Sequence, residues 1–131
     1  MFVDASALTA MILEEGGFPD LIERVERRRV KLTSPMAIWE TAVAVARVVG
    51  LPIQLAQTRT TEYLSLLGID LVPVPSETAA LALEAFDRYG KGRHPASLNF
   101  GDCFAYACAR HYRQPLLYKG GDFALTDIEP A

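Results

Sequence analysis

The chain begins with the sequence MFVDASALTAMIL (residues 1–13). Its first three residues are apolar and predict a short buried strand that ends at Asp4. Ser6 then opens an apolar-rich stretch that runs to Leu13 and indicates a helix. The opening of the chain therefore predicts a strand, a turn and a helix.

The same alternation of strands and helices continues along the chain. Ser34-Pro35 marks the start of one helix, and Gly50 and Gly68 end two others. Helices are expected over residues 19–29, 36–49, 52–67, 77–89 and 101–112, and strands over 30–33, 69–74 and 115–118, with a brief edge strand near Asp127-Ile128. Because strands almost never follow one another directly, this order predicts an α/β fold with a parallel sheet covered by helices on both faces.

Length and composition fit one globular domain over residues 1–131, with 50% hydrophobic and 22% charged residues. The longest stretch without a charge, Val48 to Thr58, is far too short for a membrane-spanning helix. Asp4 stands where a secretory signal would carry basic residues, so we expect a cytoplasmic protein. Cys103 and Cys108 face different sides of one predicted helix, which favours core packing over a disulfide or a metal pair.

The charges are unevenly distributed. A net charge of −3 suggests solubility and no nucleic-acid partner, yet the segment from Arg88 to Gly121 contains six basic residues and a single acid, Asp102. On charge alone, an ordinary solvated surface and a surface that binds a polyanion are equally good interpretations of this segment.

Four acids occupy positions at which ligands bind in parallel sheets, beyond the carboxyl ends of the strands. Asp4 ends the first strand, Asp102 starts a helix, and Asp122 follows the last long strand. Helix capping would also explain Asp4 and Asp102, and turn formation would explain Asp122. Glu40 lies inside an apolar helix without a base four residues away, so we expect its side chain to face a cleft.

Carboxylates that converge in one crevice repel one another unless a cation lies between them. An oxygen-only ligand set of Asp4, Glu40 and Asp102 predicts Mg²⁺ or Mn²⁺, which activates water in phosphodiester hydrolysis. This hypothesis requires the three carboxylates to be close enough to touch a common ion. Asn99 would orient an acid or a phosphate, or cap a loop. The bases expected to attract the phosphate backbone are Lys91, Arg93, His94 and Lys119.

Four segments together resemble the PIN-domain ribonucleases of the VapC toxin family: VDASAL (residues 3–8), the helix that carries Glu40, LNFGDCFAYA (98–107) and LYKGGDF (117–123). The resemblance implies a three-layer α/β/α sandwich, usually found as a homodimer. It also implies a Mg²⁺-dependent endoribonuclease that cuts tRNA or ribosomal RNA, inhibits translation and is paired with a VapB-type antitoxin. Position by position, Asp4, Glu40 and Asp102 match the metal-holding acids, and Asp122 matches a more variable fourth.

Three other interpretations compete with a nuclease. An aspartyl phosphatase needs a second acid two residues after the first, where this chain has Ser6, and a receiver domain needs paired acids after its first strand. A non-enzymatic dimeric interaction module would explain the apolar helices without a metal. It predicts that Mn²⁺ leaves the melting temperature unchanged.

Overall fold

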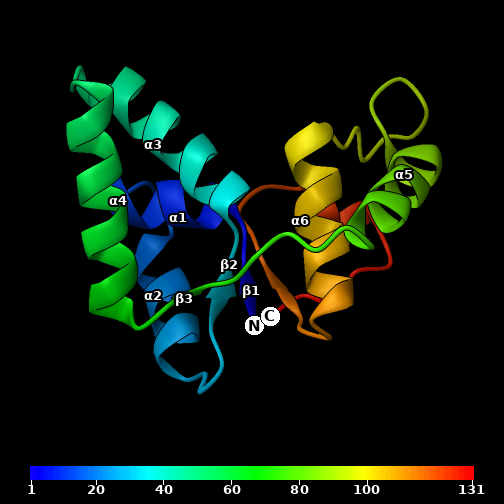
Figure 1. The fold of residues 1–131 in the computed structure, drawn as a ribbon, viewed down its shortest axis with the longest axis horizontal. Coiled ribbons are helices and arrows are strands. Elements are labelled where there is room, and N and C mark those ends of the chain that lie inside the picture. Colours follow the sequence, from blue (N-terminus) through cyan, green and yellow to red (C-terminus); the bar gives the residue numbers. More distant parts are fainter.

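The computed structural model describes residues 1–131, which form a four-stranded sheet with helices on both faces (Figure 1). The strands are β1 (Phe2–Val3), β2 (Leu32–Thr33), β3 (Asp70–Leu71) and β4 (Leu116–Leu117). The helices are α1 (Ala5–Ile12), α2 (Phe18–Glu26), α3 (Pro35–Val49), α4 (Ile53–Leu67), α5 (Thr78–Tyr89) and α6 (Phe100–His111), followed by a short 3₁₀ helix, η1 (Phe123–Leu125).

The sheet is parallel throughout, with strand order β3-β2-β1-β4. Phe2 pairs with Leu32 on one side and with Leu116 on the other, so β1 is central. Neighbouring residues of a strand point to opposite faces, and each face of this sheet builds its own core. Met1 and Val3 join one apolar cluster, whereas Phe2 joins the other.

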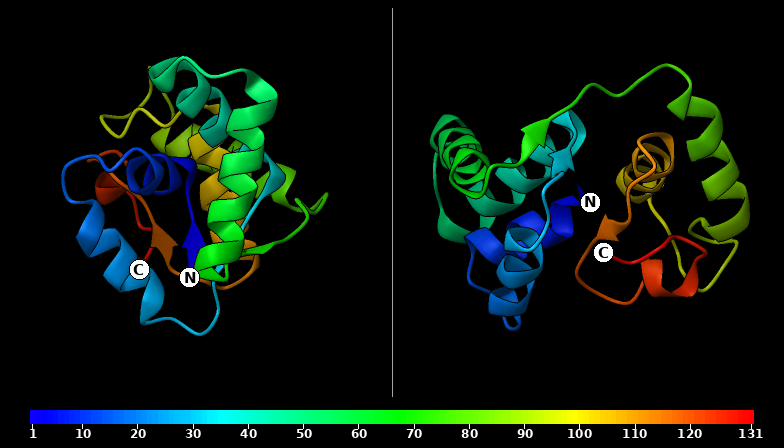
Figure 2. Two further views of the ribbon diagram at one scale, coloured as in Figure 1. Left: turned by 90° about the vertical axis from the view of Figure 1, so that its left-hand side faces the viewer. Right: turned by 90° about the horizontal axis from the view of Figure 1, so that it is seen from below.

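The two clusters define the layers. Helices α1 to α4 cover one face, and α5 and α6 cover the other (Figures 1 and 2). The connection between β3 and α5 passes from the first layer to the second, which is clear in the right-hand view of Figure 2. The α/β fold, its parallel sheet and its three layers are therefore confirmed. None of the helices is long and apolar enough to cross a bilayer.

One predicted element is wrong. The segment near Asp127-Ile128 is not a strand; the only sheet contact of this terminal stretch is an isolated parallel bridge between Leu116 and Pro130. The preceding residues form η1, and the side chain of Asp127 is held by Tyr106 and Arg88. Ile128 is nevertheless buried, so the apolar signal in this segment reflects burial and not strand pairing.

Candidate active site

The carboxyl ends of the strands lie at the opposite end of the sheet from the two termini (Figure 1). Residues at these strand ends line a cavity of about 400 Å³. Three of the four predicted acids, Asp4, Glu40 and Asp102, lie on its wall. The remaining lining residues are Ala5, Ser6, Thr9, Glu15, Ala44, Asn99, Lys119 and Gly120. Side chains almost a hundred residues apart in the sequence therefore meet at one place.

Asp4 is held in place by its neighbour Ser6. It directly follows β1 and caps α1, and its carboxylate accepts hydrogen bonds from the Ser6 backbone N–H (2.9 Å) and the Ser6 hydroxyl (2.5 Å). The Ser6 Oγ in turn accepts a hydrogen bond from the backbone N–H of Lys119 at 3.0 Å. Ser6 thus ties the carboxylate at the end of β1 to the segment that follows β4.

Glu40 enters the cavity from the second turn of α3 and forms no ion pair or hydrogen bond with another side chain. It lies against the first turn of α6. A Cβ atom placed on Gly101 would come within 2.0 Å of Glu40 Oε1 and 2.6 Å of its Cδ. Only a residue without a side chain allows α6 to approach this carboxylate so closely. The prediction that Glu40 faces a cleft and is not paired with a base is confirmed.

Asp102 has a structural and an electrostatic role. Its Oδ2 accepts a hydrogen bond from the Asn99 backbone N–H at 2.8 Å, while Asn99 Oδ1 accepts one from the Asp102 backbone N–H at 3.0 Å. This reciprocal pair is a capping box that starts α6. Asn99 is therefore the cap of α6, and Asp102, expected to be the cap itself, lies inside the first turn, where it completes the capping box and stays on the cavity wall.

The charges in the cavity are poorly compensated. Burial, together with the negative charges of Asp4 and Asp102, raises the pKa of Glu40 to about 7. Burial also raises the pKa of Asp4, against the opposing effect of its hydrogen bonds from Ser6. The pKa of Asp102 is raised by burial and by the charges of Asp4 and Asp122. All three carboxyl groups therefore resist ionisation, chiefly because they are buried, and for Glu40 and Asp102 also because like charges lie nearby.

Asp122 stands apart from the other three acids. It is exposed, immediately precedes η1 and does not line the cavity, although it is near enough to raise the pKa of Asp102. The only base on the cavity wall is Lys119, whose Nζ donates to Glu15 at 2.6 Å.

The chemistry of this donor set fits a hard divalent cation, because it offers carboxylate oxygens with raised pKa values and neither His nor Cys. Asp4, Glu40 and Asp102 are the residues that would hold it. With the side chains as they lie, however, no three His, Cys, Asp or Glu residues are arranged to hold one ion. The requirement that all three carboxylates touch a common ion is thus unmet in this arrangement, and metal binding stays a prediction.

Three predicted substrate-binding residues do not reach the cavity. Lys91, Arg93 and His94 belong to the loop between α5 and α6, on the far side of α6 from α3 (Figure 1). Arg93 pairs with Asp87 at 2.8 Å, and His94 Nδ1 accepts a hydrogen bond from the Ala96 backbone N–H at 3.1 Å. Their proposed contact with RNA stays a prediction.

The sequence interpretation missed two residues that shape the site, Ser6 and Gly101. The spacing Asp-x-Ser could have pointed to Ser6, since a serine two residues after a strand-end acid can donate to its carboxylate. Nothing in the sequence alone reveals that Gly101 faces Glu40. Cys103 and Cys108 are free and buried with pKa values raised by burial to about 11, which confirms core packing for both.

Comparison with known proteins identifies the family. The model of the PIN domain family matches residues 1–129. Ribonuclease VapC30 of Mycobacterium tuberculosis is 40% identical over 128 residues, which are 98% of this chain and 95% of that protein. The chain belongs to the VapC family of PIN-domain ribonucleases. A VapC ribonuclease of Rhizobium meliloti is 37% identical over 139 residues, covering 97% of this chain and 98% of that one.

A solved structure supports the fold of this VapC-family chain. The crystal structure of Mycobacterium tuberculosis VapC20, described as a sarcin-ricin loop cleaving toxin, superposes with a TM-score of 0.75 and covers 99% of this chain and 97% of that one. At 20% sequence identity, the likeness establishes a shared PIN-domain architecture.

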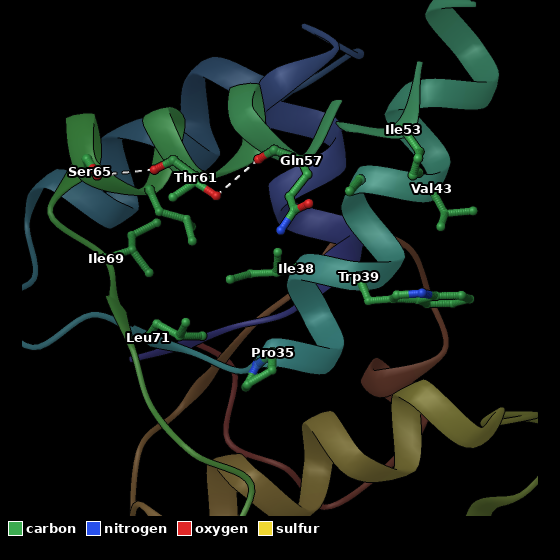
Figure 3. A pocket seen from close by; sticks show the side chains of 12 residues that line it. Pro35, Ile38, Trp39, Val43, Ile53, Gln57, Thr61, Ser65, Ile69 and Leu71 are labelled. Carbon is green, nitrogen blue, oxygen red and sulfur yellow. Dashed lines mark hydrogen bonds between the residues drawn. The ribbon is translucent and has the colours of Figure 1, made fainter. Parts of the chain in front are cut away.

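The VapC-family chain also has a mostly apolar groove of about 510 Å³ between α3 and α4 (Figure 3). Ile38 of α3 points toward Ile69 and Leu71 across the groove, and Trp39 lies at its edge with its ring directed away from Ile38. α3 therefore has an apolar face besides the one that packs in the core.

Proposed function

We propose that the chain is a Mg²⁺- or Mn²⁺-dependent endoribonuclease that acts as the toxin of a toxin–antitoxin pair. The observation that carries this proposal is the gathering of the Asp4, Glu40 and Asp102 carboxylates, without basic partners, on the wall of one cavity. RNA cleavage is the activity given in the names of the related proteins. The products would be RNA fragments with 5′-phosphate and 3′-hydroxyl ends.

The residues of the cavity would have different roles in hydrolysis. When bound there, Mg²⁺ or Mn²⁺ would offset the carboxylate charges, activate water for attack on phosphorus and stabilise the leaving 3′ oxygen. Ser6 and Asn99 hold the Asp4 and Asp102 carboxylates in fixed positions. Glu40 would join Asp4 and Asp102 in holding that ion.

Cations beside the cavity would attract the RNA. Lys119 lies on the cavity wall, where its ammonium group can leave Glu15 for a phosphate oxygen. Lys91, Arg93 and His94 would contact the RNA further along its backbone. Asp122, outside the cavity, would support the site through its charge.

Two protein partners are part of the proposal. A VapB-type antitoxin would insert an amphipathic helix into the apolar groove between α3 and α4, the usual way in which such grooves are filled. The toxin itself would form a homodimer. Sedimentation of the chain alone and with the antitoxin measures both associations.

The test compares the wild-type protein with the variants Asp4→Asn and Asp102→Asn. Asparagine keeps one oxygen for the hydrogen bonds from Ser6 or Asn99 and removes the charge, so both variants should fold. We expect each to lose at least about 100-fold in the rate of RNA cleavage, measured by sequencing the 5′ ends of RNA fragments. The matched control Asp20→Asn removes an exposed acid of α2 and should cleave normally.

Melting curves provide a second measurement. Mn²⁺ at about 100 times its Kd should stabilise the wild-type protein by about 2.7 kcal/mol and leave the two variants almost unchanged. The proposal would be contradicted if both variants cleaved RNA at the wild-type rate, or if Mn²⁺ left the melting temperature of the wild-type protein unchanged. Either result would favour a non-enzymatic interaction module.

A further inference from the structure

Two large aromatic side chains stand exposed beside the acidic cavity. Trp39 of α3 is 67% exposed, and Phe100 of α6 is 71% exposed. Single exposed apolar residues are common on protein surfaces. These two, however, come from different layers of the fold and line one hollow of about 320 Å³, together with Pro35, Met36 and Glu40.

The hollow adjoins the candidate active site. Glu40 belongs to the walls of both the hollow and the acidic cavity. Trp39 directly precedes Glu40, and Phe100 lies two residues before Asp102. An RNA strand whose phosphate lies at the carboxylates can therefore place an adjacent nucleoside close to the two rings.

The walls of the hollow suit an uncharged ring better than a phosphate. They contain no basic side chain, and Glu40 would repel a phosphate there. Phe100 packs against Phe104 with ring centroids 5.0 Å apart, which leaves much of its surface exposed, and no aromatic ring of the chain stacks on Trp39. Exposed aromatic faces beside a phosphate site are the usual platform for unpaired bases.

We propose that Trp39 and Phe100 stack on unpaired bases next to the phosphodiester that is cleaved. The substrate class is then RNA in which these bases are unstacked, as in a loop or a single strand, and not an uninterrupted duplex. This inference rests on the proposed function, because it requires a scissile phosphate at the carboxylates.

Trp39 is the only tryptophan of the chain, so its fluorescence reports directly on the hollow. The experiment titrates the Asp4→Asn variant, which should leave RNA uncut, with a single-stranded oligoribonucleotide and with an abasic strand of the same length. We expect quenching by the first strand and little change with the second. Equal quenching by both strands would overturn the proposal, because binding would then depend on the backbone alone.

Cleavage kinetics test the same contact in the active enzyme. Trp39→Ala and Phe100→Ala should each raise KM for a single-stranded RNA by about 10-fold, whereas Trp39→Phe should restore most of the loss. Leu66→Ala removes an equally exposed apolar side chain of α4 that lines neither the hollow nor the cavity, and it should behave as wild type.

The outcomes separate this inference from the proposed function. If the wild-type protein is active and both alanine variants have its KM, the stacking proposal is overturned but the proposed function is not. Stacking would also be overturned if a second copy of the chain covered the hollow. In that case the Trp39 emission would change on dilution of the protein, and Trp39→Ala would sediment with a smaller mass than the wild-type protein. Wild-type protein that cleaves no RNA would instead contradict the proposed function.

Discussion

Gly101 is the residue on which the shape of the cavity depends most directly. Its missing side chain leaves the space in which the Glu40 carboxylate lies, against the first turn of α6. The atoms that a new Cβ would meet are the far end of a flexible side chain, so they can move aside at little cost. A substitution here should therefore displace the carboxylate and not the backbone.

We predict that Gly101→Ala lowers RNA cleavage by about 10-fold or more, the range seen when a partner that orients a metal ligand is lost. Its melting temperature should stay equal to that of the wild-type protein or rise slightly, because alanine favours a helix more than glycine does. Cleavage assays and melting curves check the two effects together.

The control for this prediction is Gly16→Ala. A Cβ on Gly16 meets nothing within 4 Å, and this variant should cleave RNA normally. A Gly101→Ala protein with wild-type activity would show that the position of Glu40 beside α6 is unimportant.

The individual acids could be predicted for physical reasons that the sequence contains. Asp4 and Asp102 follow from the positions of strand and helix ends, and Glu40 follows from its isolation in an apolar helix. The space at Gly101 depends on how two distant helices pack, which no local pattern encodes. The loop bases Lys91 and Arg93 show the same limit: their charge is evident, but the side of α6 on which they lie is a tertiary property.

At the scale of elements, the start of α6 combines stability and function. The capping box of Asn99 and Asp102 satisfies backbone N–H groups that the helix leaves without partners. The same box uses one oxygen of the Asp102 carboxylate. Asp102 therefore belongs both to the helix cap and to the cavity wall. A substitution that disrupts the cap should also displace the Asp102 carboxylate in the cavity.

We predict that Asn99→Ala lowers the free energy of unfolding by about 1 kcal/mol, a typical loss for a removed N-cap. Asn99→Ser should keep most of the stability, since serine is also a good cap. Urea unfolding followed by circular dichroism measures both. Equal stability of the alanine and wild-type proteins would mean that the cap contributes nothing.

The elements themselves were largely predictable, and their lengths less so. Each expected helix exists, because glycine, proline and capping residues mark its ends. The helix expected over 19–29 ends at Glu26, and the strand expected over 69–74 is only Asp70–Leu71. β3 lies at the edge of the sheet beside β2 alone, and β2 ends at Thr33, so the residues after Val72 find no strand to pair with. Ile69 is buried, but Leu71 is 55% exposed, so apolar character overestimated both burial and pairing in this stretch.

For the whole molecule, the shared pocket links stability to pH. The folded state raises the pKa of Glu40 from 4.5 to about 7, so the unfolded chain releases this proton first. The contribution of Glu40 to stability is complete below pH 4.5 and is lost as the pH rises through about 7. The raised pKa values of Asp4 and Asp102 act in the same direction.

We predict that, without divalent cations, Glu40→Gln melts at a higher temperature than the wild-type protein at pH 8, by on the order of a few degrees. The two proteins should converge below about pH 4.5, where Glu40 is protonated in both states. Melting curves from pH 4 to 8 measure the difference. The control is Glu62→Gln at an exposed glutamate of α4, whose melting temperature should change with pH as that of the wild-type protein does. A difference in melting temperature between Glu40→Gln and the wild-type protein that did not vary with pH would contradict the coupling.

The wide separation of the cavity residues along the chain matters during synthesis. Asp102 is synthesised 98 residues after Asp4. The strand that places Lys119 against Ser6 is made later still. A nascent chain therefore holds an incomplete set of carboxylates until Asp102 has been made, and synthesis that stops before that point yields a fragment without a working site.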